Sequence, residues 1–282
     1  MIGELTPGAP PPDPPELPPA ARPRWPAWMG FAAMGAGLVV VTVAVAPLVP
    51  VVLLLTEGGA IGALALLTLL LVQDVAFVLT AGFFARLKGR LRAWHFGLRA
   101  TPPKRSLVIV VGATLAIFGF EIGYVELLGV DESNVDDITG EGAFAVLAVS
   151  LAVIVVAPVT EELFFRAFFY RSLRTHLPIW LAVLINGTVF GMLHFQGIES
   201  LSILPVIAVF GFGVCLVYEA TGSVFAVIAI HAAFNTLAST DPATTATLIL
   251  PLAVGVAVCA SCVLAALRLG PAPSPFPPPA RA

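Results

Sequence analysis

Long apolar stretches separated by short polar segments dominate the pattern of this chain. Runs of about 20 mostly apolar residues cross a bilayer as helices, and such runs occur near 28–55, 60–84, 106–128, 143–173, 178–198, 203–218, 222–238 and 246–267. The pattern predicts an all-α, polytopic membrane helix bundle with about eight transmembrane helices. Because the first run contains Pro47 and Pro50, we expect its end to kink or to re-enter the membrane.

Proline-rich segments flank the apolar region at both ends of the chain. Residues 1–27 and 269–282 have a composition that is typical of disordered or polyproline-like tails. We therefore predict a membrane-embedded domain over residues 28–268, with its functional core at about 143–240. The beginning of the sequence lacks a basic segment followed directly by an apolar run, so no signal peptide is predicted.

The placement of charge predicts the orientation in the membrane. Only 11% of the residues are charged, against about 25% in soluble domains. With eight spans, all 14 Lys and Arg residues fall on one side, at Arg22, Arg24, Arg86, Lys88, Arg90, Arg92, Arg99, Lys104, Arg105, Arg166, Arg171, Arg174, Arg268 and Arg281. By the positive-inside rule both termini are cytoplasmic. The net charge of −3 is too small to indicate a nucleic-acid partner.

Few ionisable or amide side chains lie inside the predicted spans, and these are the candidates for chemistry. They are Gln73, Asp74, Glu121, Glu126, Glu161, Glu162, Asn186, His194, His231 and Asn235. For Asp74 we expect hydrogen bonding between helices. The pair Cys259 and Cys262 lies in an apolar run without the context of a redox or metal motif, so we interpret it as apolar packing.

The stretch "APVTEELFFR" (157–166) places three ionisable residues in an apolar span. Glu162 and Arg166 are i,i+4 and can pair on one face of a helix. Glu161 then points elsewhere and is left available to other helices. Pro158 removes a backbone hydrogen bond and is expected to bend the helix. Alone, this cluster fits a cytoplasmic interface as well as an active site.

Two further stretches carry histidines. In "NGTVFGMLHFQG" (186–197), Phe190 and His194 are i,i+4, and Gly187 and Gly191 form a small-residue face for close helix packing. By counting, His194 lies nearer the outer end of its span than Glu161 does, so a tilt or a re-entrant bend is needed to bring the two together.

In "AIHAAFNTLAS" (229–239), His231 and Asn235 share a face. Each histidine alone fits a packing role. Jointly, a glutamate and two histidines on three spans fit a hydrolytic zinc site, with Glu161, His194 and His231 as ligands. The sequence has no H-E-x-x-H motif, so the common soluble zincin arrangement is not expected.

These three stretches resemble the E-E-x-x-x-R, F-x-x-x-H and H-x-x-x-N/D motifs of the CPBP family, the CAAX prenyl endopeptidases and bacteriocin-processing intramembrane proteases. The segment "FGLR" (96–99) is also similar to one often seen there. The resemblance covers about residues 90–240. It implies an intramembrane endopeptidase whose site opens toward the cytoplasm, acting on a membrane-associated and possibly lipid-modified peptide or protein.

The resemblance also implies residue roles. Glu161 would activate the attacking water, His194 and His231 would bind that water or a divalent metal such as zinc, and Asn235 would stabilise the oxyanion. Glu162 and Arg166 would hold the first motif in place. A metal-free glutamate–histidine mechanism stays open, as do the substrate and the oligomeric state. The composition indicates a bacterium, and hence a multi-pass protein of the inner membrane.

Two alternatives remain at this stage. The first is a non-catalytic immunity or scaffold membrane protein of the same fold. The second is a transporter with Asp74, Glu121 and Glu161 as a relay, although no internal repeat of the kind that transporters show is found in the sequence.

Overall fold

The computed structural model describes residues 25–48, 50, 60–91, 93–99, 103–129, 142–195 and 197–268. Over these residues the chain forms helices and no strands, which confirms the all-α prediction. The α-helices are α1 (Ala27–Val45), α3 (Ala60–Arg86), α4 (Pro103–Leu128), α5 (Ala143–Ser150), α6 (Ala157–Phe164), α7 (Arg171–Arg174), α8 (Ile179–Met192), α9 (Leu204–Thr221), α10 (Val224–Ala238) and α11 (Thr245–Arg268). Two π-helical segments, η5 (Leu151–Val156) and η6 (Phe165–Tyr170), and two 3-10 turns, η2 (Ala93–Phe96) and η7 (Ile198–Ser202), complete the described part.

Each predicted span coincides with a helical segment. Six helices are long and apolar enough to cross a membrane, and α8 and α10 are shorter apolar helices. The protein is therefore a multi-pass membrane protein. The exact number of crossings and the cytoplasmic side of the termini stay predictions.

The ends of the domain differ slightly from the prediction. Helix α1 ends at Val45, ahead of Pro47 as expected, and residues 51–59 lie outside the described residues. Trp25 was assigned to the N-terminal tail, but it is buried and packs its ring on Phe168 at 5.1 Å. It therefore belongs to the helical domain. The predicted tails otherwise lie at residues 1–24 and 269–282, outside the described part.

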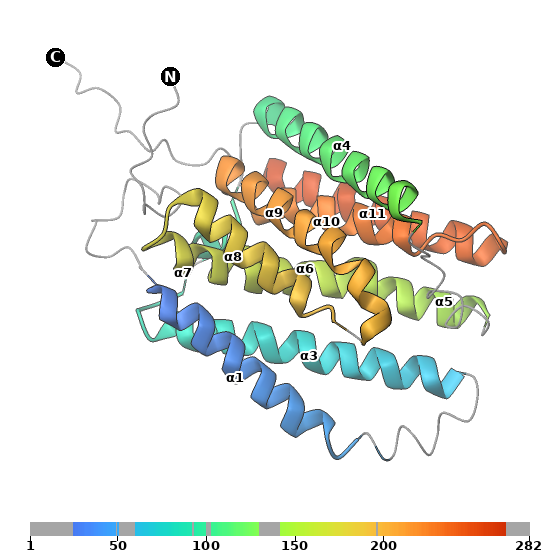
Figure 1. Ribbon diagram of the computed structural model, residues 1–282, viewed down its shortest axis with the longest axis horizontal. Helices are drawn as coiled ribbons and strands as arrows, with labels where there is room; N and C mark the ends of the chain where they lie inside the picture. The colour runs from blue at the N-terminus through green and yellow to red at the C-terminus, as the bar shows by residue number, and fades with distance from the viewer. Residues whose placement is uncertain are drawn as a thin grey trace.

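The long helical segment Ala143–Arg174 lies in the middle of the bundle. Figure 1 shows α1 and α3 along one edge and α4 along the opposite edge. Helices α8 and α9 pack closely, because a Cβ added at Gly211 would lie only 2.8 Å from the Cα of Gly187. The small-residue face predicted around Gly187 is therefore used for helix contact.

The "FGLR" segment anchors the turn between α9 and α10. Arg99 Nε donates to the Gly222 carbonyl at 2.7 Å, and Val224 N donates to the Gly97 carbonyl at 2.9 Å. Both glycines have positive φ, 72° at Gly97 and 63° at Gly222, a conformation that favours residues without Cβ. These two hydrogen bonds fix the start of α10, the helix that carries His231.

Helix α6, which carries both glutamates, lies between the two π-helical segments. Pro158 stands in its first turn and has no N–H to donate to the preceding turn. The expected irregularity is thus present as η5, directly before Ala157. Single π-turns are rare and occur frequently at functional sites, so this stretch positions the candidate site.

Candidate active site

Glu162 and Arg166 form a fully buried ion pair. Arg166 Nη1 donates to Glu162 Oε1 at 2.7 Å, and neither side chain is exposed. The pair predicted from the i,i+4 spacing is therefore confirmed. The guanidinium also lies 4.4 Å from the centroid of the Phe190 ring. Because a lone carboxylate in this surrounding would be strongly disfavoured, the arginine compensates the burial of Glu162 and holds it in one orientation.

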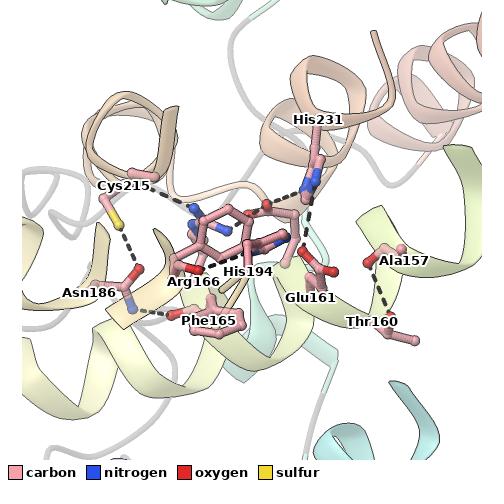
Figure 2. A network of polar contacts seen from close by, with 12 residues as sticks. Ala157, Thr160, Glu161, Phe165, Arg166, Asn186, His194, Cys215 and His231 are labelled. Atoms are coloured by element: carbon pink, nitrogen blue, oxygen red, sulfur yellow. Dashed lines mark hydrogen bonds and ion pairs between the residues drawn. The ribbon is translucent and has the colours of Figure 1, made fainter. Parts of the chain in front are cut away.

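His231 on α10 connects the two glutamates (Figure 2). Its Nδ1 lies 2.7 Å from Glu162 Oε1, and its Nε2 lies 3.8 Å from Glu161 Oε2. An ionised carboxylate can only accept hydrogen bonds, so Nδ1 carries the hydrogen and a neutral ring keeps its lone pair on Nε2. The ring of Phe210 packs against the imidazole at 4.9 Å. His231 is therefore held in one tautomer and one orientation.

Glu161 is the less constrained of the two glutamates. Its side chain is 17% exposed, and Oε2 has no hydrogen-bond partner among the described residues. Oε2 and His231 Nε2 are both acceptors, so the 3.8 Å between them is suited to a water that donates one hydrogen to each. Glu162 Oε2 and Arg166 Nε are also buried without a partner in the described part. Such a group of unpaired polar atoms calls for a functional explanation.

His194 lies close to this group but outside a helix. Helix α8 ends at Met192, so the span predicted to reach residue 198 is shorter and His194 stands in the turn that follows. With 14 residues, α8 is about 21 Å long, well short of the hydrocarbon core of about 30 Å. The depth of His194 counted from the sequence therefore rested on a span boundary that the structure corrects.

Phe190 joins His194 to the rest of the site. Its ring lies 4.7 Å from that of His194 and 5.9 Å from that of His231. His194 Nδ1 lies 2.8 Å from the Phe190 carbonyl, which can only accept, so the neutral imidazole presents a lone pair on Nε2.

Asn235 shares the helix of His231 but has a different partner. Its Nδ2 donates to the carbonyl of Val153 in η5 at 2.7 Å. An amide nitrogen carries two hydrogens, so one remains for another acceptor. The bond to Val153 fixes the amide and connects α10 to the π-helical segment before the glutamates.

The described side chains do not fit a three-ligand metal site. No group of three His, Cys, Asp or Glu side chains that could hold a metal ion occurs among the residues that the structure describes. Glu161 and His231 face each other, but His194 does not complete a cluster with them. Zinc therefore stays a prediction.

Several neighbours of the site received no role from the sequence. Asn186, noted only as a polar residue in a span, donates to the Phe165 carbonyl and accepts from Cys215 (Figure 2). Apart from its hydrophobic side chain, nothing in the sequence indicates a role for Phe210. Asp74 on α3 is buried, and the hydrogen bond between helices expected for it stays a prediction, because the Thr160 hydroxyl donates to the Val156 carbonyl.

The match to known proteins is confined to this region. Residues 143–237, about a third of the chain, match the family model described as type II CAAX prenyl endopeptidase Rce1-like. The matched segment carries the residues of the three motifs, from Glu161 to Asn235, but not the "FGLR" segment at 96–99. No curated protein and no solved structure matches the chain.

Proposed function

We propose that the chain is an intramembrane endopeptidase, because residues 143–237 match the family model described as type II CAAX prenyl endopeptidase Rce1-like. It would hydrolyse a peptide bond in a membrane-associated peptide or protein. The observation that carries the proposal is the placement of His231 between a fixed carboxylate, Glu162, and an unpaired one, Glu161. In this arrangement two acceptor atoms, Glu161 Oε2 and His231 Nε2, can bind the same water molecule.

Glu161 acts as general base and then as general acid. It accepts one hydrogen of the water while the water oxygen adds to the carbonyl carbon of the scissile bond, and the carbonyl electron pair moves onto oxygen. The protonated Glu161 then gives that hydrogen to the peptide nitrogen as the C–N bond breaks. One product gains a carboxyl group and the other an amine.

The remaining site residues orient the reactants. His231 accepts the second hydrogen of the water through Nε2, and the Nε2 lone pair of His194 can hold the same water or a polar substrate group. The free hydrogen of the Asn235 amide would donate to the oxyanion. Glu162 and Arg166 act through His231, since they fix its tautomer.

Replacement of Glu161 tests the proposal. The probes are a fluorogenic peptide with a farnesylated CAAX-type C-terminus and the same peptide without the farnesyl group, each offered to protein in liposomes. We expect Glu161→Gln to lower the cleavage rate by about 10²- to 10⁴-fold, the usual contribution of a general base.

The matched control is Glu126→Gln, the same chemical change at an exposed position of α4. It should cleave like the wild type. Equal rates for wild type and Glu161→Gln would overturn the assignment of the base. Cleavage of neither peptide by the wild type, with cellular function kept in Glu161→Gln, would favour the non-catalytic scaffold.

A further inference from the structure

The two π-helical segments beside α6 are each held by a side-chain amide from another helix. Asn235 on α10 donates to Val153 in η5, and Asn186 on α8 donates to Phe165 in η6 at 2.9 Å. Where a helix changes from i→i+4 to i→i+5 bonding, its hydrogen-bond ladder is interrupted, and a buried carbonyl there needs another donor. Each asparagine supplies such a donor at one end of the glutamate-bearing helix.

The Asn186 amide is itself fixed in orientation by a thiol. The side chain is fully buried, and its Oδ1 accepts from Cys215 Sγ at 3.0 Å. In the flipped orientation Oδ1 would face the Phe165 carbonyl, and two acceptors would oppose each other. The Phe165 carbonyl therefore sets the orientation of the amide, and the thiol of Cys215, also fully buried, holds the amide there by donating to its oxygen.

Phe165 connects this contact to the catalytic group. The next residue along the chain is Arg166, whose guanidinium binds Glu162, and Glu162 in turn binds Nδ1 of His231. The Phe165 ring also packs on Phe190 at 5.0 Å. A shift of the Phe165 carbonyl would thus move Arg166, which orients Glu162. Two hydrogen bonds, from Arg166 to Glu162 and from Glu162 to His231, join this arginine to the imidazole.

We propose that Asn186 and Cys215 are a pair of positioning residues that hold η6 in register and thereby fix the tautomer of His231. The pair acts through the backbone of Phe165. Its effect on cleavage rests on the proposed function, but its effect on His231 does not. Both effects follow from one chain of contacts, Cys215 to Asn186 to the Phe165 backbone.

The experiment compares three variants with the wild type in detergent. Asn186→Leu removes both hydrogen bonds at similar volume, Cys215→Val removes only the thiol donor, and Cys215→Ser restores a donor. Thr188→Val, an isosteric change at an exposed position of the same helix, is the matched control. The readouts are the ¹⁵N NMR signals of the four labelled histidines and the kinetic constants on the farnesylated peptide.

We expect Asn186→Leu and Cys215→Val to change the His231 imidazole signals, assigned by their loss in His231→Gln. We also expect kcat to fall by about 10- to 100-fold, the loss found when a group that orients a metal-bound imidazole is removed, while KM stays near that of the wild type. Cys215→Ser and Thr188→Val should keep both the signals and kcat. If Asn186→Leu does not fold, Cys215→Val against Cys215→Ser gives the same comparison.

Unchanged His231 signals in a folded Cys215→Val or Asn186→Leu protein would overturn the proposal, whatever the melting temperature. If the wild type cleaves neither peptide but the signals change as expected, the positioning role stands and the proposed protease function fails.

Discussion

The two sides of α6 present glutamates in opposite situations. On one side Glu162 is completely buried, and its Oε1 takes both Arg166 and His231 at 2.7 Å. On the other side Glu161 is partly exposed, and its Oε2 lies 3.8 Å from His231 Nε2 and has no hydrogen-bond partner within the described residues. Adjacent residues of the same type thus differ in how firmly they are held. The fixed carboxylate suits an orienting role and the free one suits proton transfer.

The largest expected effect on stability comes from the fixed side. Arg166→Met leaves the carboxylate of Glu162 buried without its cation, so the free energy of unfolding should fall by about 3–5 kcal/mol. Thermal denaturation in detergent measures this change. The control Glu126→Gln alters an exposed carboxylate and should melt with the wild type. An Arg166→Met protein with the same melting temperature as that control would show that the Glu162–Arg166 ion pair does not stabilise the fold.

The smallest expected effect concerns metal. If hydrolysis uses the metal-free glutamate–histidine mechanism, cleavage after treatment with EDTA should stay within about twofold of the untreated rate, because removal of metal then leaves the barrier unchanged. Cleavage assays and metal content of the same sample measure this. Loss of activity on EDTA treatment that added Zn²⁺ restores would instead establish the zinc prediction and require His194 to move.

Much of the glutamate side of the site could be predicted from spacing alone. The i,i+4 relation of Glu162 and Arg166 gave the ion pair and left Glu161 free, because both follow from helix geometry. Spacing alone does not predict the contact of His231 with Glu162, because residues 69 positions apart meet only once the helices pack. That His231 lies near the glutamates was expected from the motifs. The spans were predictable because apolar runs of this length are distinctive.

Other features depend on helix register, which the sequence pattern does not encode. The π-turns, and the bonds of Asn186 and Asn235 to backbone carbonyls, arise only once α8 and α10 are placed against the central segment. The end of α8 at Met192 was missed because the apolar pattern continues through Phe195. Nothing in the sequence indicates a role for Cys215, since a thiol in an apolar run gives no sign that it donates a hydrogen bond.

The most direct test of the account compares Glu161→Gln with Glu162→Gln in one preparation, with the cleavage rate and the melting temperature measured for both. We predict that Glu161→Gln has the melting temperature of the wild type but cleaves at least about 100-fold more slowly. Glu162→Gln should have a clearly lower melting temperature, because Arg166 loses its anion. A Glu161→Gln protein that cleaves like the wild type, or the reverse order of melting temperatures, would contradict the division of roles between the two glutamates.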